Sequence, residues 1–389
     1  MKILYHHRIA SKDGQAVHIE EMIEALRERS CEVVVVAPPG WSDTDFGGGG
    51  GATAALRRYL PRAASELMEL AYNWFAYRKL SQAVRVHQPD ALYERHNLYL
   101  LAGSWVKHRF GIPYLLEVNA PLAAERLRHD GLGLPRVAQR LETQVWKCAD
   151  AVLPVTKVLA DILEQHGVAS ERLHITPNGI SPATFADPPS NEDAKRQLGC
   201  DGQLVLGFTG FVRPWHGLDQ VVDYIAASPQ LNLALLVVGD GPAREALTAQ
   251  AIRLGIADRV RFTGIVTRDR IPEHVSAFDI ALQPASTPYA SPLKLFEYFA
   301  LGLAVVAPNQ ANLTEIIVDG KNGILFEPGN RESLYSALDR LVTDTSFRSE
   351  LGNAARATIT ERNLTWQGNA QRVIDLVHRL QKTMQPVRR

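Results

Sequence analysis

The 389-residue chain has few cysteines, no excess of either charge and no long hydrophobic run. Its three cysteines, Cys31, Cys148 and Cys200, form neither a metal-binding spacing nor an even disulfide framework. Its 42 basic and 42 acidic side chains cancel, which argues against a nucleic-acid-binding protein. No apolar run reaches the roughly 18 residues of a membrane-spanning helix, and the N-terminus lacks signal-peptide features. We therefore expect a cytoplasmic protein.

Short apolar runs alternate with amphipathic stretches along the whole chain, which is typical of α/β domains with parallel sheets. The length predicts two such domains. We place the first at 1–180, a linker at 181–203 and the second at 204–365, because residues 181–193 carry three of the 22 prolines. The last helix, within 366–389, is long enough to pack back on the first domain.

Twelve short apolar runs are the predicted strands, six in each domain. Parallel strands that are buried on both faces read as continuous apolar runs of this kind. In the first domain they are 3–5, 33–37, 91–93, 114–118, 151–155 and 173–176, and in the second 204–208, 233–238, 260–262, 280–283, 304–307 and 323–326. Open α/β sheets bind ligands at the carboxyl ends of their strands, so both domains are expected to contribute loops to a cleft.

A basic, aromatic segment at 46–77 begins with five consecutive glycines. Residues 52–110 carry nine Lys or Arg against four Asp or Glu, a local excess of positive charge. Two interpretations are open. The segment either lies on an anionic membrane surface, or forms a loop and a surface helix whose arginines extend along apolar neighbours.

The most informative motif follows the fourth predicted strand of the second domain. Ser291 is a good N-cap and Pro292 suits the first helical position, so a helix should begin there. The amides of Leu293 and Lys294, with the Lys294 charge, form an anion site that suits a phosphate or diphosphate. Glu297, one turn further, either accepts hydrogen bonds from a ribose diol or pairs with Lys294.

The first domain offers candidates of its own. Gly14 opens a helix and permits close approach of the backbone to a ligand, which gives a second phosphate contact. His18 is either a ligand contact or a histidine bonded within the fold, and the same alternatives hold for His6 and His7. Glu117, at the carboxyl end of a strand, either orients an acceptor hydroxyl or pairs with Arg95.

Motifs for other chemistries are incomplete. The Gly-Asp-Gly sequence at 239–241 imitates a dinucleotide fingerprint, but Arg244 stands where Gly or Ala is needed. The Asp-Thr-Asp sequence at 43–45 imitates a metal-binding pair, but it adjoins the glycines and is better interpreted as an exposed acidic loop. The chain has no Gly-x-Ser-x-Gly sequence, which argues against a hydrolase triad.

The run SPLKLFEYFALGLAVVAPNQANLTEIIVDGKNGILFEPGN resembles the signature region of glycosyltransferase family 4, whose members are retaining enzymes of the GT-B fold. Five other blocks resemble family blocks and occur in family order: residues 1–26, HITPNGI at 174–180, GFTGFVRPWHGLD at 207–219, VVGDGP at 237–242 and FTGIV at 262–266. The resemblance implies two facing Rossmann-like, doubly wound parallel-sheet domains with a cleft between them.

The resemblance also implies which residues contact a nucleoside diphosphate sugar. Glu297 is assigned to the ribose, the amides of Leu293 and Lys294 to the diphosphate, and the backbone of 262–266 to the base, with uridine preferred and guanosine second. The residues implied for donor binding are Gly14, Gly210, Val266, Ser291, Pro292, Leu293, Lys294 and Glu297. No metal or further cofactor is expected.

The chain departs from the family pattern at several positions. Tyr289 stands where the family has an acidic residue eight positions before Glu297. Phe211 and His216 stand where Arg and Lys are usual, and Arg213 is placed to restore the guanidinium. Asn119 aligns with a functional histidine. The predicted catalytic residues are Arg213, His216, Lys294, Glu117 and Asn119.

The function implied is transfer of a sugar from a nucleoside diphosphate to a hydroxyl acceptor, with retention of configuration. The basic segment suggests a lipid-linked saccharide at the cytoplasmic face of the membrane, and a soluble acceptor is the alternative. Two other functions stay open: a sugar-nucleotide epimerase of the same fold, and an inactive sugar-nucleotide-binding subunit of a biosynthetic complex.

Overall fold

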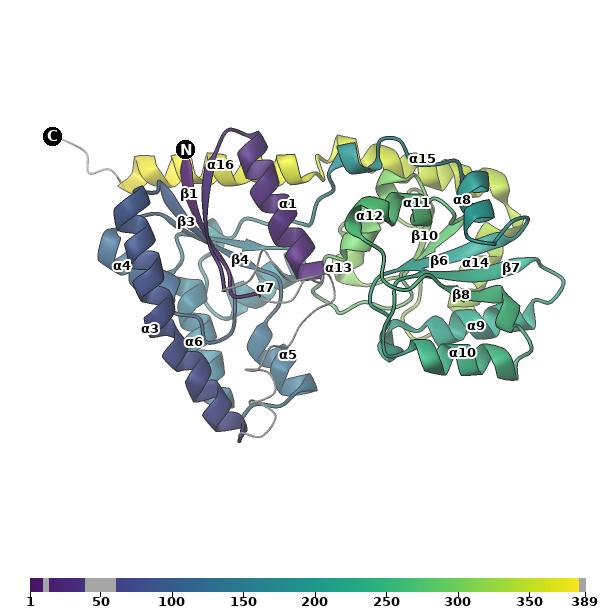
Figure 1. Cartoon of the computed structure of the whole chain (residues 1–389), viewed down its shortest axis with the longest axis horizontal. Helices are drawn as coiled ribbons and strands as arrows, with labels where there is room; N and C mark the ends of the chain where they lie inside the picture. The colour runs from purple at the N-terminus through teal and green to yellow at the C-terminus, as the bar shows by residue number, and fades with distance from the viewer. Residues whose placement is uncertain (10–13, 39–60, 385–389) are drawn as a thin grey trace. The chain divides into compact units, whose positions relative to one another are not determined.

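The computed structural model describes residues 1–9, 14–38 and 61–384, which fall into two compact units (Figure 1). The first unit contains Met1–Pro177, Tyr289–Ser291 and the C-terminal Trp366–Arg389. The second contains Asn178–Pro288 and Pro292–Thr365. The Asp-Thr-Asp sequence at 43–45 and the first part of the basic segment, residues 46–60 with the glycine run, lie outside the described residues.

The first unit is built on a parallel sheet with the strand order β2-β1-β3-β4-β5. Its strands are β1 (Lys2–His6), β2 (Glu32–Val36), β3 (Ala91–Arg95), β4 (Tyr114–Val118) and β5 (Ala151–Pro154). In the register of β1, Leu4 aligns with Val34 of β2 on one side and Leu92 of β3 on the other. The strand expected at 173–176 is not formed, because Leu173 makes an isolated bridge with Val152 instead.

Helices cover this sheet, and one of them comes from the far end of the chain. They are α1 (Gly14–Glu28), α3 (Arg62–His87), α4 (Ala102–Phe110), α5 (Leu122–His129), α6 (Pro135–Cys148), α7 (Lys157–Gln165) and α16 (Trp366–Met384). The yellow helix α16 runs beside α1 (Figure 1). The His18 and Trp366 rings meet edge to face with their centroids 4.7 Å apart, and Gln367 Nε2 donates to Glu28 Oε2 over 2.8 Å. The final helix therefore belongs to the first unit.

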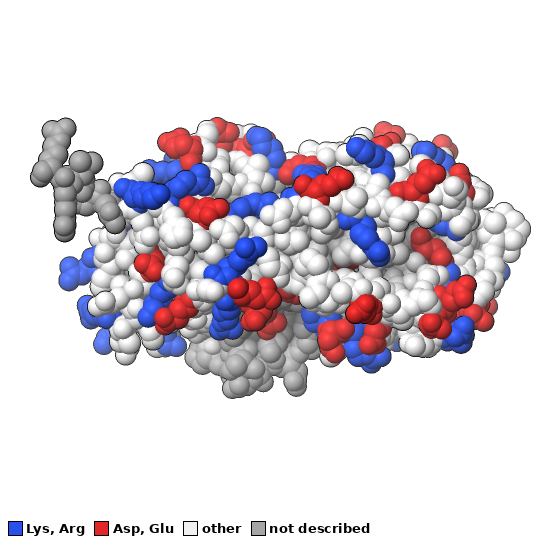
Figure 2. All heavy atoms as spheres, turned by 90° about the horizontal axis from the view of Figure 1, so that it is seen from above, with Lys and Arg blue, Asp and Glu red and all other residues white. Residues whose placement is uncertain are grey.

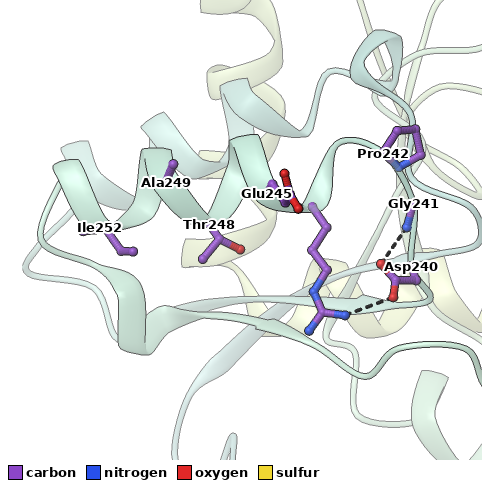
Figure 3. A pocket seen from close by; sticks show the side chains of 8 residues that line it. Asp240, Gly241, Pro242, Glu245, Thr248, Ala249 and Ile252 are labelled. Carbon is purple, nitrogen blue, oxygen red and sulfur yellow. Dashed lines mark hydrogen bonds and ion pairs between the residues drawn. The ribbon is translucent and has the colours of Figure 1, made fainter.

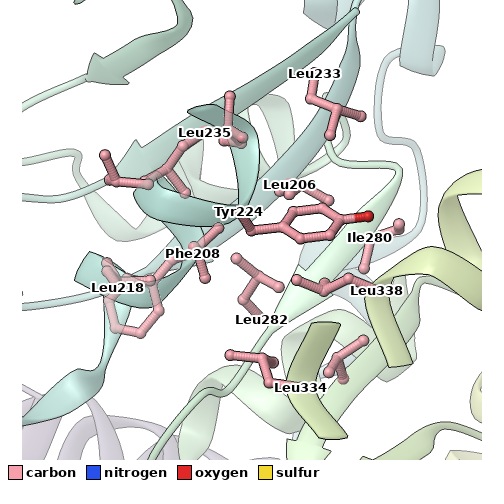
Figure 4. Close-up of a cluster of buried hydrophobic side chains, with 14 of the residues drawn as sticks. Leu206, Phe208, Leu218, Tyr224, Leu233, Leu235, Ile280, Leu282, Leu334 and Leu338 are labelled. Carbon is pink, nitrogen blue, oxygen red and sulfur yellow. The ribbon is translucent and has the colours of Figure 1, made fainter. Parts of the chain in front are cut away.

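The second unit has a six-stranded parallel sheet in the order β11-β10-β9-β6-β7-β8. Its strands are β6 (Leu204–Thr209), β7 (Leu233–Val238), β8 (Val260–Phe262), β9 (Ile280–Leu282), β10 (Ala304–Pro308) and β11 (Ile324–Phe326). Its helices are α8 (Asn191–Gln197), α9 (Leu218–Ala227), α10 (Arg244–Arg253), α11 (Ile271–Val275), α12 (Leu293–Ala300), α13 (Ala311–Thr314), α14 (Arg331–Thr343) and α15 (Thr345–Glu361). Leucines from β6, β7, β9 and α14 form one of its cores (Figure 4).

The segment 181–203, predicted as a linker, is an ordered part of the second unit. It contains α8, and the side chains of Phe185, Ala194 and Cys200 are buried in the core on one face of the sheet. The Ser190 hydroxyl caps α8 by accepting a hydrogen bond from the Asp193 amide over 3.2 Å. The prolines that suggested a linker therefore lie in a packed connection, and the second unit begins before residue 204.

Each sheet has one place where the strand order reverses. In the first sheet it lies between β1 and β3, and in the second between β6 and β9. The loops that leave the two strands of such a pair turn to opposite faces of the sheet and leave room for a ligand at the carboxyl ends. Ligand contacts are therefore expected at the carboxyl ends of these four strands.

None of the helices in the described ranges is both long and apolar enough to cross a lipid bilayer. Over the face drawn in Figure 2, Lys and Arg side chains are interspersed with Asp and Glu. The balanced composition of the chain is thus repeated on that face.

Candidate active site

The helix α12 is the next helix after β9, one of the two strands at the strand-order reversal of the second sheet. Pro292 is its N-cap, with an extended ψ of 120°, so the helix starts one residue later than the predicted cap at Ser291 implies. No side chain caps this end of the helix. The first amides, those of Leu293 and Lys294, are available to an anion, and the positive end of the helix dipole favours one.

Lys294 lies against the end of β6, on the other side of the reversal. Its Nζ is 3.9 Å from the centroid of the Phe208 ring, and a Cβ added to Gly210 would lie 3.6 Å from the same nitrogen. Burial lowers the pKa of Lys294 to about 7, although the negative charge of Glu297 opposes the shift. Within the described part of the chain no carboxylate forms an ion pair with this lysine, so its charge lacks a direct counterion.

His216 occupies the position where a lysine is usual, and its environment keeps it neutral. Its Nδ1 accepts a hydrogen bond from the Arg213 amide over 2.9 Å, which places the proton of the neutral ring on Nε2. Burial and the nearby charges of Lys294 and Arg213 lower its pKa to about 3. The ring can therefore offer one N–H donor without a charge. The Arg213 guanidinium is exposed and lies 5.4 Å from the Phe211 ring centroid.

Glu297 is 5% exposed and forms an ion pair with Arg268. The structure therefore pairs Glu297 with Arg268 and not with Lys294. The Arg268 guanidinium carbon also lies 5.6 Å from the centroid of the Phe185 ring. Arg268 was not predicted from the sequence, because it lies in the short helical turn Arg268–Arg270, 29 residues before its partner on α12, and no local pattern links the two.

The Gly-Asp-Gly sequence at 239–241 has a structural task. Gly239 has a φ of 143°, and a Cβ there would lie 2.1 Å from the carbonyl oxygen of Gly210. The two loops also bond to one another, since the Val212 amide donates to the carbonyl of Asp240 over 2.9 Å. Glycine is needed at residue 239 because the loop after β7 packs closely against the backbone of the loop after β6. Val266 follows β8 in this region and is partly buried against the core.

A pocket beside this loop does not include Lys294 or Glu297. It is lined by residues 240–242 and by side chains of α10 (Figure 3). Asp240 Oδ2 pairs with Arg244 over 3.0 Å, and its Oδ1 accepts from the Gly241 amide. The carboxylate of Asp240 is thus bonded to its own loop and to the first residue of α10. In the described ranges no group of three or more His, Cys, Asp or Glu is placed to hold a metal ion.

In the first unit, Glu117 at the end of β4 is the centre of a buried cluster. Its side chain forms an ion pair with Arg95, contacts His18 Nε2 at 3.0 Å and accepts from the Tyr93 hydroxyl over 2.7 Å. Asn119 Nδ2 also donates to it. Burial opposes ionisation, but His18, Arg95 and Tyr93 together hold the pKa of Glu117 well below its usual range. Both Arg95 and His18, considered separately in the sequence, therefore have the same partner.

The neighbouring histidines, His6 and His7, are also buried within the fold. His6 Nδ1 lies 2.5 Å from Glu94 Oε2, and the Tyr114 hydroxyl donates to the other oxygen of Glu94 over 2.6 Å. His7 is buried, and burial together with the charge of His6 lowers its pKa to about 3. Gly14 begins α1, at the edge of the described residues.

Tyr289, where an acidic residue was expected by resemblance, groups with the first unit. Its carbonyl oxygen accepts a hydrogen bond from the Thr156 hydroxyl over 2.9 Å. Burial and the nearby charge of Glu125 raise the pKa of its phenol to about 12, so the side chain is neutral. It can donate or accept hydrogen bonds but carries no charge.

Two family models match consecutive parts of this chain. The model for the glycosyl transferase 4-like domain matches residues 13–179, and the model for glycosyl transferases group 1 matches residues 190–358. The first match covers most of the first sheet and the second covers the second sheet with Lys294 and Glu297.

Curated relatives carry glycosyltransferase names. D-inositol 3-phosphate glycosyltransferase of Stackebrandtia nassauensis is 31% identical over 294 residues, which are 71% of this chain and 65% of that protein. 2-Deoxystreptamine glucosyltransferase of Streptomyces kanamyceticus is 25% identical over 308 residues, 76% of this chain and 75% of that one. The chain thus spans just under two thirds of the first relative.

Solved structures share the fold. HepE of Anabaena in complex with UDP is 20% identical, with a TM-score of 0.76 over 97% of this chain and 100% of that one. HepE in complex with UDP-glucose matches with a TM-score of 0.75 at 20% identity, over 97% and 99% of the two chains. At this identity the similarity concerns the fold.

Proposed function

The chain belongs to the group 1 glycosyltransferases of family 4, which have the GT-B fold, and on that premise we propose that it transfers a sugar from a nucleoside diphosphate donor to a hydroxyl group with retention of configuration. The observation that supports this most is the pairing of the uncapped α12 N-terminus with Lys294 at the strand-order reversal. Backbone donors and a poorly solvated cation in one place suit a diphosphate.

The donor diphosphate would lie between the end of β6 and the start of α12. The amides of Leu293 and Lys294 donate to its oxygens, with Ser291 and Pro292 leading into the helix. Lys294 and the Nε2–H of His216 contribute further donors, and Arg213 on the same loop adds a guanidinium. Gly210 keeps this loop free of a side chain beside Lys294, where a Cβ would be 3.6 Å from Nζ.

Glu297 is the proposed acceptor for the ribose hydroxyls. It lies one helical turn behind the α12 N-terminus, and its ion pair with Arg268 holds its side chain in place. The base would rest on the backbone of 262–266, ending at Val266. Uridine is the favoured base, which the UDP complexes of HepE support, and guanosine is the second choice.

Catalysis in this proposal rests on stabilising the leaving group. The bond between the anomeric carbon and the diphosphate oxygen breaks, and the acceptor oxygen bonds to the same carbon on the same face. A phosphate oxygen of the leaving diphosphate takes the acceptor proton, so charge and atoms balance. Lys294 supplies positive charge to the diphosphate, and the amides and His216 donate hydrogen bonds to it, so the proposal requires no metal ion and no other cofactor.

The acceptor would be bound by the first unit. Asn119, held by Glu117, offers a neutral hydrogen-bonding group where the family has a histidine. Gly14 opens α1, the helix whose His18 contacts Glu117. Our preferred acceptor is a lipid-linked saccharide at the inner face of the cytoplasmic membrane. The relatives are named for inositol phosphate and deoxystreptamine, which supports a soluble polyhydroxylated acceptor as the alternative.

Thermal unfolding with a panel of sugar nucleotides tests the donor assignment. A donor that binds the native protein raises the melting temperature, and we expect UDP-sugars to do so and GDP-sugars to do so less. Release of UDP in the presence of membrane lipid extracts or of soluble cyclitols then separates the two acceptor classes. If no sugar nucleotide shifts the melting temperature, the proposal is contradicted. A new sugar nucleotide formed from the donor alone indicates an epimerase.

A further inference from the structure

Between residues 65 and 75, the helix α3 buries its polar side chains and exposes large apolar ones, the reverse of an ordinary surface helix. Further along the helix, Leu80 and Val84 are buried in the usual way. Glu66 is 0% exposed, Glu69 6% and Asn73 1%, whereas Trp74 is 64% exposed and Leu67 57%. The long blue helix in Figure 1 therefore turns an apolar side outward, beside α4. Such an arrangement needs an explanation, because large apolar side chains gain free energy when they leave water.

The buried polar side chains fix this orientation. Asn73 Oδ1 accepts from the amides of Leu101 and Ala102, at 2.6 and 3.1 Å, where α4 begins. Glu66 accepts from the amides of Gly133 and Leu134, at 2.7 and 2.8 Å, just before α6. Rotating α3 to bury its apolar side would leave these amides and carboxylates unsatisfied, which costs about 1–3 kcal/mol for each group. The exposed apolar side is therefore built into the fold.

The exposed side chains form a continuous surface that reaches α4. The Tyr77 ring centroid lies 6.4 Å from that of Trp74 and 6.0 Å from that of Trp105, which is 40% exposed. We call this surface the α3 ridge; it consists of Leu67, Met68, Trp74, Phe75, Tyr77 and Trp105. Exposed residues continue along α3 to Val86, so the outward side is about 30 Å long at 1.5 Å for each residue.

The charges around the α3 ridge have one sign. Arg78 and Arg85 are exposed on the same helix, and Lys79 Nζ lies 4.8 Å from the Phe75 ring centroid. The acidic residues of α3, Glu66 and Glu69, are buried. The outward side of the helix thus combines aromatic and aliphatic side chains with cations and lacks carboxylates.

We propose that the α3 ridge binds the interfacial region of an anionic lipid bilayer. Trp, Tyr and Phe enter the boundary between headgroups and acyl chains, while the arginines and Lys79 pair with lipid phosphates. The inference narrows the predicted surface at 46–77 to its described part and extends it to Trp105. It deepens the proposed function, on which it rests for the lipid-linked acceptor.

Co-sedimentation with vesicles tests the α3 ridge. Vesicles of phosphatidylcholine are compared with vesicles that also contain phosphatidylglycerol. We expect Trp74→Ser with Phe75→Ser to reduce binding to the anionic vesicles at least roughly tenfold. Arg78→Gln with Arg85→Gln should reduce it roughly tenfold on anionic vesicles only, since its effect is electrostatic. The matched control, Ile252→Ser with Leu254→Ser, removes two exposed apolar side chains of the second unit and should leave binding unchanged.

Undiminished vesicle binding by the Trp74 and Phe75 variant overturns the proposal. The proposal is also overturned if the wild-type protein does not bind anionic vesicles but forms a dimer, and the Trp74 and Phe75 variant is a monomer. The α3 ridge then binds a second copy of the chain. The melting-temperature shift with UDP-sugars is measured on the same samples. Vesicle binding without a melting-temperature shift refutes the proposed function and leaves the α3 ridge assignment intact. A melting-temperature shift with UDP-sugars but no vesicle binding overturns the α3 ridge assignment and leaves the proposed function intact.

Discussion

The two strand-end clusters of this protein handle buried charge in opposite ways. In the first unit, the carboxylate of Glu117 is surrounded by Arg95, His18, Tyr93 and Asn119, and its charge is balanced within the fold. In the second unit, Lys294 lies on an aromatic ring beside uncapped amides, with a pKa lowered to about 7. The first cluster is complete as it stands, and the second is suited to receive an anion.

This difference separates stability from binding. A satisfied ion pair stabilises the unit that contains it relative to a variant that lacks one partner, since the remaining charge would be buried alone. A desolvated cation does the opposite, because the folded state disfavours its charged form until a ligand supplies the counter-charge. Substitutions in the Glu117 cluster should therefore lower the stability of the fold, whereas substitutions around Lys294 should weaken donor binding or catalysis.

The largest expected effect is that of Glu117→Gln on stability. It leaves Arg95 without its charged partner, at a cost of about 3–5 kcal/mol and a fall in melting temperature on the order of 10 °C. Donor binding below that temperature should stay unchanged. Calorimetry measures both, and the double variant with Arg95→Met should be more stable than the single one. If Glu117→Gln alone has the same melting temperature as the wild type, the description of this cluster is contradicted.

Lys294→Met should act on catalysis instead. Loss of a preorganised cation at the leaving group lowers kcat/KM by a factor on the order of 10²–10³. The melting temperature of the donor-free protein should not fall, because a lysine whose folded pKa is below its unfolded value destabilises the folded state at neutral and acidic pH. The control is Lys321→Met, at an exposed lysine of the same unit. Equal activity of the two variants would remove Lys294 from the site.

Glu297→Gln should weaken donor binding by about 1.5–3 kcal/mol, because the ribose diol loses its charged acceptor. Isothermal titration with the UDP-sugar measures the loss, and Glu245→Gln, at an exposed position on α10, is the control. A donor with 2′-deoxyribose should bind the wild type and the Glu297 variant more nearly alike. If the variant loses as much affinity for the deoxy donor as for the normal one, Glu297 does not bind the ribose 2′-hydroxyl.

The smallest effect is a pH dependence of donor affinity. Free Lys294 has a pKa of about 7, and the donor's negative charge raises it, so binding above pH 7 takes up a proton. Affinity should be steady below this pH and fall as pH rises through 8 and 9, by at most about tenfold for each unit. In Lys294→Arg the slope should vanish, because arginine keeps its proton. An equal slope in both proteins assigns the titration to another group.

The sequence predicted the sheets well for a simple reason. The bounds of β7 and β8 agree with the predicted strands, since buried parallel strands are uninterrupted apolar runs whose ends are marked by turns. The start of α12 was one residue off, as the local signals of Ser291 and Pro292 compete for the cap. The linker prediction failed because prolines mark a turn in a packed segment as readily as in an open one, and the burial of Phe185 and Ala194 is not a local property.

The sequence by itself determined two α/β units, the place of the helix N-terminus and a basic aromatic surface in the first unit, because local spacing and composition encode these features. Only the tertiary structure decided that Glu297 pairs with Arg268, that His216 is neutral and that α3 turns its aromatic side outward. Partners far apart in the chain and the loss of water around buried groups set these properties, and neither can be read from neighbouring residues.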